Sequence, residues 1–193
     1  MEALAVVIAR AVPGRPVKLR LTREEEFYTT FVRQGLVAHF KMGCDKDGNL
    51  LAMENTYYWD SGAYTEYGVN MARAGGYSGA GPYDVPNVKV DSICVYTNHP
   101  VGGPMRGFGM PELHSGLEQC IDDLAHAIKM DPLEFRRLNC VRGGDIIATG
   151  MKMHPIGLPE CIEKAAQAIH WGHKTQPIAS NKRRGKGLAI MWK

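Results

Sequence analysis

The most regular pattern along the chain is an alternation of apolar and polar residues. It occupies 36–43 and again 50–59, and the polar segment 45–48, Asp-Lys-Asp-Gly, separates the two stretches. An Asp-Gly pair between alternating apolar runs is a strong local signal for a β-hairpin. The same alternation predicts further strands over 16–21 and 87–96.

Apolar residues spaced three and four positions apart predict the helices. The clearest helix begins at Pro111. Its apolar positions are Leu113, Leu117, Cys120, Ile121, Leu124 and Ile128. Asp131 and Pro132 begin a second helix, which runs to about Asn139, because Asp is a favoured N-cap and Pro a favoured first helical residue. A third helix is predicted over 159–169.

Both ends of the chain carry apolar segments. Residues 3–12 predict a helix that no Ser, Thr, Asp or Asn precedes as a cap, and 187–192 predict a buried strand. A chain with such ends is expected to be part of a longer polypeptide. Near the N-terminal helix, Thr22 and Glu25 have the spacing of a capping box at the start of a short acidic turn.

The remaining stretches are less regular. Residues 61–82 are rich in glycine and predict an irregular, closely packed region with one helical turn near Met71, and 141–158 predict a loop. The expected fold class is therefore mixed α/β, in which a sheet with a long antiparallel hairpin packs against helices.

Composition excludes several classes of protein. Hydrophobic residues make up 45% and charged residues 22% of the 193 residues, as in an ordinary soluble globular protein. The net charge of +3 gives no reason to expect nucleic acid or a membrane surface as a partner. The five cysteines include no Cys-x-x-Cys pair, which argues against an iron–sulfur cluster, a zinc cage or a disulfide framework in this chain. Mostly buried thiols in a reducing cytoplasm are expected.

The loop 102–109 has the composition most typical of a ligand site. Four of its eight residues are glycine, and it leads into the predicted helix at Pro111. Glycine lets a backbone approach a ligand closely, and the N-terminus of a helix favours anions. An anionic or oxo ligand is therefore a candidate. The alternative is a glycine-rich strand-to-helix turn with Arg106 in a salt bridge. The segment lacks the Gly-Lys-Ser/Thr of a phosphate loop.

Residues 105–112 read Met-Arg-Gly-Phe-Gly-Met-Pro-Glu, and three further segments accompany them in order, at 14–25, 83–88 and 131–139. Together these segments resemble the molybdenum hydroxylases, the family of xanthine dehydrogenase and aldehyde oxidase, whose signature is arginine-glycine-phenylalanine-glycine. The resemblance covers essentially the whole chain.

The resemblance implies roles for the signature residues. In such enzymes the arginine lies beside the molybdenum centre, held largely through its backbone amide, and this position is Arg106. Gly107 and Gly109 would let the loop lie against the pterin cofactor. Phe108 would pack on an aromatic substrate ring.

Two positions depart from the family's pattern. Met105, in the same cofactor-contacting loop, stands where the family often has Phe or Tyr, so the exact substrate is left open. Arg73 lies near the place of an arginine that orients purine substrates, but the glycine-rich stretch after it breaks the alignment.

For the whole enzyme, the resemblance implies hydroxylation of an N-heterocycle or an aldehyde at a molybdenum–molybdopterin centre, with water as the source of oxygen. FAD and 2Fe-2S clusters would lie on other segments or subunits. Residues 1–145 would form the back half of the first molybdopterin-binding domain, and 146–193 the start of the second. The family's upstream glutamine-glycine loop and downstream glutamate base have no counterpart in the sequence, so we expect no catalytic residue here and an inactive isolated chain.

A different class of protein stays open as an alternative: a small non-catalytic subunit or assembly module that keeps the fold without the chemistry.

Two other groups of residues give weaker signals. His170 and His173 are interpreted as surface or helix-end groups rather than metal ligands. An aromatic-rich stretch is expected to form core or an interface to other domains; it comprises Tyr57, Tyr58, Trp59, Tyr64 and Tyr67.

Overall fold

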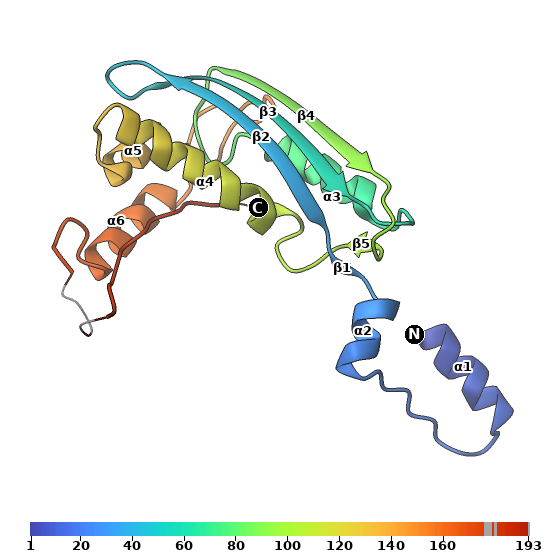
Figure 1. Ribbon diagram of the computed structural model, residues 1–193. Helices are drawn as coiled ribbons and strands as arrows, with labels where there is room; N and C mark the ends of the chain where they lie inside the picture. The colour runs from blue at the N-terminus through green and yellow to red at the C-terminus, as the bar shows by residue number, and fades with distance from the viewer. Residues whose placement is uncertain (176–178, 180, 193) are drawn as a thin grey trace.

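A computed structural model describes residues 1–175, 179 and 181–192 (Figure 1). Within this part the helices are α1 (Glu2–Ala11), α2 (Arg23–Thr29), α3 (Gly68–Tyr77), α4 (Met110–Ala127), α5 (Pro132–Asn139) and α6 (Leu158–Ala168). The strands are β1 (Val32–Arg33), β2 (Gly35–Cys44), β3 (Leu50–Asp60), β4 (Asn87–Val95) and β5 (Gly102–Gly103). The predicted mixed α/β class is confirmed.

Among the described residues the main sheet has the order β2-β3-β4, with β2 and β3 antiparallel and β3 and β4 parallel. Asp45 shapes the hairpin turn, because its carboxylate accepts hydrogen bonds from the backbone N–H groups of Asp47 and Asn49, both at 2.9 Å. Gly48 completes the turn with a φ of 91°. The predicted hairpin is confirmed, as is the strand over 87–96.

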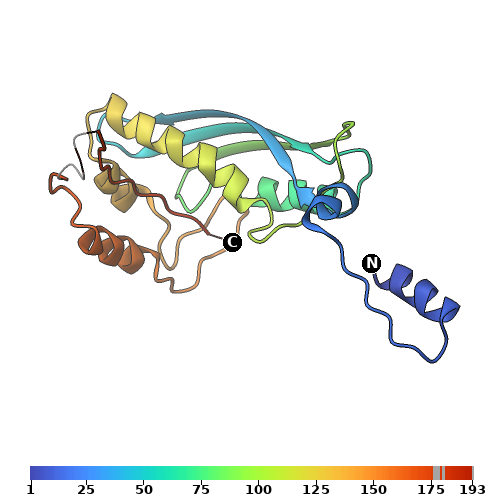
Figure 2. The same ribbon diagram turned by 60° about the horizontal axis from the view of Figure 1, so that its bottom comes forward.

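One face of this sheet is covered by α3 and α4 (Figures 1 and 2). Both helices approach it at glycines. A Cβ added to Gly116 of α4 would lie 2.6 Å from the Phe40 ring, and one added to Gly75 of α3 would lie 2.3 Å from the Trp59 ring. Because such contacts leave no room for a methyl group, these glycines set the distance between helix and sheet.

The helix α3 is longer than the sequence indicates. One turn near Met71 is predicted, whereas the helix spans ten residues. Glycine in a helix interior costs about 1 kcal/mol relative to alanine, so the local sequence argues against a helix. Packing offsets this cost, since Gly75 lies against Trp59 and Gly76 against Ser92. Tertiary contacts therefore decide the conformation of this segment.

Two predicted strands are wrong. Residues 16–21 and 187–192 join no strand ladder within the described part of the chain. A strand is stabilised by hydrogen bonds to a neighbouring strand, and alternation alone supplies no partner. The segment 187–192 packs on α4 instead, where Ile190 is buried and its N–H donates to the Glu118 carboxylate at 2.9 Å.

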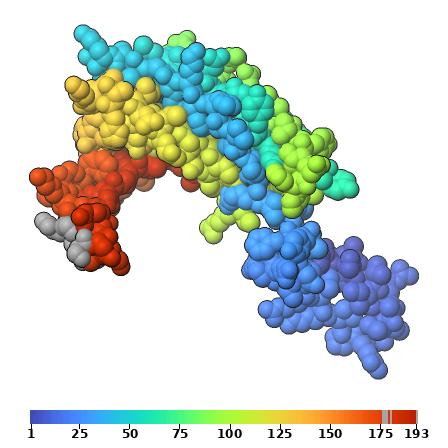
Figure 3. Space-filling view, viewed as in Figure 1, coloured from blue at the N-terminus to red at the C-terminus, as the bar shows by residue number. Residues whose placement is uncertain are grey.

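The helices α1 and α2 form an arm that projects away from the sheet (Figures 1, 2 and 3). The apolar side chains of α1, including Leu4, Val7 and Ile8, are exposed. At α2 the predicted capping box is present: Thr22 Oγ1 accepts from the Glu25 N–H, and the Glu25 carboxylate accepts from the Thr22 N–H at 2.7 Å. The arm therefore has a locally stabilised helix and an uncovered apolar surface.

A buried ion-pair network joins α4 to α5. The Arg136 side chain is fully buried and contacts the carboxylates of Glu118 at 2.9 Å and Asp122 at 2.6 Å. Glu118 also accepts a hydrogen bond from the Tyr83 hydroxyl at 2.5 Å. Burial raises the pKa of Glu118 and that of Tyr83. This network fixes the two helices that follow the signature loop.

The predicted start of α5 is confirmed, because the Asp131 carboxylate accepts a hydrogen bond from the Leu133 N–H at 2.8 Å. The helix predicted over 159–169 corresponds to α6. The expectation of mostly buried thiols is wrong: Cys140 alone among the five cysteines is buried, and Cys161 is exposed. The others lie half-buried on strands and helices that have one open face.

Candidate functional site

The signature loop, residues 104–109, leaves the short strand β5 and ends at the start of α4. Its beginning is fixed by a parallel pair of strands, in which Val32 lies opposite Gly102 and Arg33 opposite Gly103. A Cβ at Gly102 would lie 2.5 Å from the backbone oxygen of Asp60, so this close approach requires glycine. The sequence gives little sign of this two-residue pairing, because each strand is very short.

Two turns fold the loop onto itself. The Phe108 N–H donates to the Met105 oxygen at 2.8 Å, and the Met110 N–H donates to the Gly107 oxygen at 3.1 Å. Gly107, Phe108 and Gly109 all have positive φ values, of 101°, 51° and 89°. Phe108 is the strained member, since a side chain in the left-handed region costs about 1 to 2 kcal/mol.

Both signature glycines are also closely packed. A Cβ at Gly107 would lie 2.6 Å from Pro111 Cδ, and one at Gly109 would lie 3.1 Å from the Trp59 ring. Gly109 is the N-cap of α4. These contacts join the loop to the first turn of α4 and to the core below it.

The outer side of the loop is open. Met105 and Arg106 are exposed, and Phe108 is half-buried. Within the described residues, the backbone N–H groups of Arg106, Gly107 and Gly109 donate no hydrogen bond. Unengaged N–H groups directly before a helix N-terminus attract an anionic oxygen.

A second arginine, Arg33, contacts the backbone of the loop, and the sequence analysis did not identify it as part of the site. The Arg33 guanidinium donates from Nη2 to the Arg106 carbonyl oxygen at 3.1 Å, and its Nη1 lies 2.9 Å from a Glu112 carboxylate oxygen. The salt bridge proposed as an alternative for Arg106 is not seen, since no ion pair of its guanidinium occurs in the described part of the chain. The ion pair at this place belongs to Arg33, 73 residues away along the sequence.

This loop lies within a known family. The family model described as "Molybdopterin cofactor-binding domain" matches residues 1–140. The chain belongs to this molybdopterin cofactor-binding domain family.

Relatives and solved structures agree with this assignment. The chain is 36% identical to the xanthine dehydrogenase molybdenum-binding subunit of Escherichia coli O157:H7, over 97% of the chain and 26% of the relative. It is 40% identical to the nicotinate dehydrogenase large molybdopterin subunit of Eubacterium barkeri, over 79% of the chain and 36% of the relative. The aldehyde oxidoreductase structure from Desulfovibrio desulfuricans ATCC 27774 superposes with a TM-score of 0.79 at 34% identity, covering 88% of this chain and 19% of that one.

The predicted family is thus confirmed, and the chain spans about a quarter of the first of these relatives and about a third of the second. The loop also fits the family's cofactor on the evidence of its own geometry. Molybdopterin is rich in anionic oxygen, and the loop offers three N–H groups that donate no hydrogen bond within the described residues, two of them on glycines that carry no side chain.

Arg73 lies on α3 and is exposed. The helix contacts β5, so it borders the start of the signature loop. No hydrogen bond or ion pair joins the Arg73 side chain to the loop among the described residues. Its role as a substrate-orienting residue stays a prediction.

Behind the loop, Asp60 ties the end of β3 to the segment that precedes β5. Its carboxylate accepts hydrogen bonds from the Thr97 hydroxyl at 2.5 Å and the Gly62 N–H at 2.9 Å, and it pairs with His99 Nδ1. Burial raises the pKa of Asp60, but these hydrogen bonds outweigh burial and hold the pKa below its ordinary value. The segment leading into the loop is therefore anchored on the sheet.

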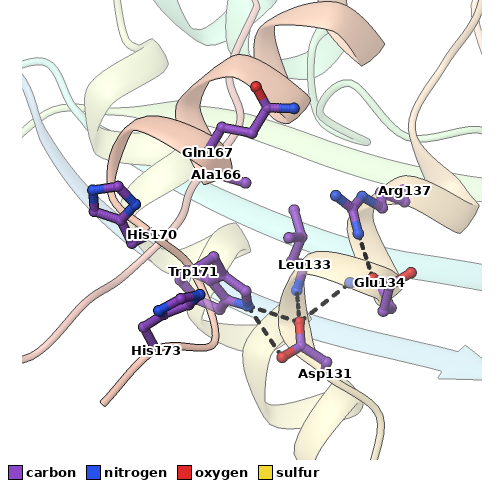
Figure 4. A pocket seen from close by; sticks show the side chains of 9 residues that line it. All are labelled: Asp131, Leu133, Glu134, Arg137, Ala166, Gln167, His170, Trp171 and His173. Atoms are coloured by element: carbon purple, nitrogen blue, oxygen red, sulfur yellow. Dashed lines mark hydrogen bonds and ion pairs between the residues drawn. The ribbon is translucent and has the colours of Figure 1, made fainter. Parts of the chain in front are cut away.

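His170 and His173 lie far from this loop, beside a pocket of about 650 Å³ between α5 and α6 (Figure 4). Both histidines are exposed. Trp171, which lies between them in the sequence, donates its indole N–H to the Asp131 carboxylate. No group of three metal-ligating side chains occurs among the described residues. Of the aromatic stretch, Tyr57 and Trp59 are core residues, whereas Tyr58, Tyr64 and Tyr67 are exposed.

None of the helices in the described part of the chain combines the length and the apolar character needed to span a bilayer.

Proposed function

We propose that this chain forms one wall of the molybdopterin pocket in a molybdenum hydroxylase that acts on an N-heterocycle or an aldehyde. The observation that carries the proposal is the open signature loop, whose N–H groups at Arg106, Gly107 and Gly109 have no partner among the described residues. Membership of the molybdopterin cofactor-binding domain family supports it.

Each signature residue has a distinct task in this proposal. The N–H groups of Arg106, Gly107 and Gly109 hold anionic oxygens of the cofactor, aided by the partial positive charge at the start of α4. When bound, the molybdenum group accepts the two electrons released as a substrate C–H and water become C–OH and two protons. The half-buried Phe108 ring forms an aromatic wall of the substrate site, flanked by the exposed Met105. Arg73 is the candidate for orienting the substrate.

The remaining parts of the enzyme lie outside this chain. Residues 1–145 form the back half of the first molybdopterin-binding domain, and residues 146–193 begin the second. FAD and 2Fe-2S clusters on other domains or subunits carry the electrons away, and the enzyme works in the cytoplasm. The general base belongs to another segment, so this chain binds and orients rather than catalyses.

Turnover of the full-length enzyme in ¹⁸O-labelled water tests the proposal. Nicotinate, quinoline and benzaldehyde supply the two substrate classes, and mass spectrometry measures the label in the product. We expect the hydroxylated heterocycles to carry one ¹⁸O atom from water, and benzoate to carry at least one, because the benzaldehyde carbonyl also exchanges its oxygen with water. Enzyme freed of its cofactor is the control and should form no product. Absence of hydroxylation with every substrate, in enzyme that carries its cofactor, would leave a binding or assembly role.

A further inference from the structure

We propose that Arg33 is a positioning residue that sets the direction of the Gly107 N–H in the signature loop. Its guanidinium reaches two groups that lie far apart in sequence, the Arg106 carbonyl oxygen at 3.1 Å and the Glu112 carboxylate at 2.9 Å. The inference rests on the proposed function, because it assigns to Arg33 the orientation of a group that binds the cofactor.

Arg33 is itself well placed for this task. It belongs to β1, where it lies opposite Gly103, so its backbone is fixed one residue before the loop begins. Glu112 stands in the first turn of α4, and its side chain is only 11% exposed. Nη1 of the guanidinium therefore pairs with a nearly buried carboxylate, while Nη2 donates to the Arg106 carbonyl oxygen in the loop.

The geometry of the peptide bond turns this contact into an orientation. The described residues contain no cis peptide bond, so the Arg106–Gly107 peptide is trans. In a planar trans peptide the C=O and the following N–H point in opposite directions. Because the Arg106 carbonyl faces Arg33, the Gly107 N–H faces away from it, toward the open side of the loop.

The same contact strengthens the Gly107 N–H as a donor. A cation on the carbonyl oxygen polarises the peptide, and a hydrogen bond with an ionised partner is stronger than one between neutral groups. The ligand favoured by such a donor is an anionic oxygen. Gly107 has a φ of 101°, in a region open chiefly to glycine. Because glycine also adopts many other backbone conformations, we expect the Arg106–Gly107 peptide to rotate more easily than its neighbours when Arg33 is removed.

An ordinary surface ion pair would behave differently, and the chain offers a matched example. Arg137 is 35% exposed and pairs with Glu134 and Glu163, whereas Arg33 is 38% exposed and pairs with Glu112. The two arginines have similar exposure and carboxylate partners, but only Arg33 of these two donates a hydrogen bond to a carbonyl oxygen of the signature loop. Arg137→Lys is therefore the control for loss of a guanidinium at a partly exposed ion pair.

Hydrogen exchange followed by mass spectrometry tests the proposal in the full-length enzyme prepared without cofactor. The reporter is the peptide over 104–112, which contains the bonded amides of Phe108 and Met110. We expect Arg33→Gln to speed exchange in this peptide by about tenfold, since a hydrogen bond to a charged group is lost. Arg33→Lys keeps the charge but lacks the planar fork, so it should not restore slow exchange. Arg137→Lys should leave the peptide unchanged.

Unchanged exchange in Arg33→Gln, full rescue by Arg33→Lys, or equal loosening of a distant peptide such as 158–168 in α6 would each overturn the proposal. The second readout is cofactor retention: Arg33→Gln should lose molybdenum and pterin together on gel filtration faster than wild type. Wild-type enzyme that contains neither would refute the proposed function instead, while the exchange data on cofactor-free enzyme would still decide whether Arg33 holds the loop.

Discussion

Replacement of Arg136 by methionine should destabilise the protein strongly, because it removes one side of the buried network between α4 and α5. The Arg136 side chain is fully buried and the Glu118 side chain is 7% exposed. Methionine fills similar space but leaves the Glu118 carboxylate without its cation. Breaking a buried pair in this way costs about 3 to 5 kcal/mol.

The loss is large relative to the stability of a typical domain, which is about 5 to 15 kcal/mol. With a urea dependence of about 2 kcal/mol per molar, the midpoint of urea unfolding should fall by roughly 2 M. The double variant Glu118→Leu with Arg136→Met should recover most of the loss, because neither charge remains buried. Arg137→Met is the control at a partly exposed pair and should cost about 1 kcal/mol or less.

The pH dependence gives a second check on the same variant. Burial raises the pKa of Glu118, and removal of Arg136 should raise it further. A carboxyl whose pKa is raised in the folded state loses stability as the pH rises through that range. The deficit of Arg136→Met should therefore be larger at pH 8 than at pH 5. Tryptophan fluorescence during urea unfolding of the 193-residue chain measures both values. An Arg136→Met deficit no larger than that of Arg137→Met, or independent of pH, would refute this reasoning.

Two further predictions concern the site. Phe108→Ala in the full-length enzyme should raise KM for aromatic substrates roughly threefold to tenfold with little change in kcat, since ring stacking contributes about 0.5 to 1.5 kcal/mol. The control is Tyr77→Ala, at an exposed aromatic residue. An unchanged KM with normal cofactor loading would remove Phe108 from the substrate wall. Asp60→Asn should lower the free energy of unfolding by about 1 to 2 kcal/mol at pH 7, as measured by urea unfolding. Because the pKa of Asp60 is lowered in the folded state, the stabilisation by its carboxylate is present above about pH 4 and disappears as the pH falls through the folded pKa. A deficit that persists at pH 2 would contradict the role assigned to the charged carboxylate.

Local signals in the sequence predicted the elements that depend on local chemistry. The hairpin follows from Asp45 and Gly48, and the start of α5 follows from the Asp131 cap, because each acts on residues a few positions away. For the signature loop, the glycines and the helix after them indicated only a candidate site, and the resemblance of residues 105–112 to the family's signature decided the prediction.

Contacts between distant segments could not be predicted in this way. The helix α3 forms against its glycine content, because those glycines pack on Trp59 and Ser92. Residues 16–21 alternate as a strand does, but no described strand lies beside them. The contact of Arg33 with Arg106 joins residues 73 positions apart, and no local pattern marks Arg33 as part of the site.

The molybdenum and pterin content of the full-length enzyme tests the central claim most directly when Gly107→Ala is compared with Gly144→Ala. The two glycines have φ values of 101° and 99°, but a Cβ at Gly107 meets Pro111 whereas one at Gly144 meets nothing within 4 Å. Wild type and Gly144→Ala should contain about one molybdenum and one pterin per chain, and Gly107→Ala should contain much less of both. Equal loading of all three proteins would show that the signature loop does not hold the cofactor.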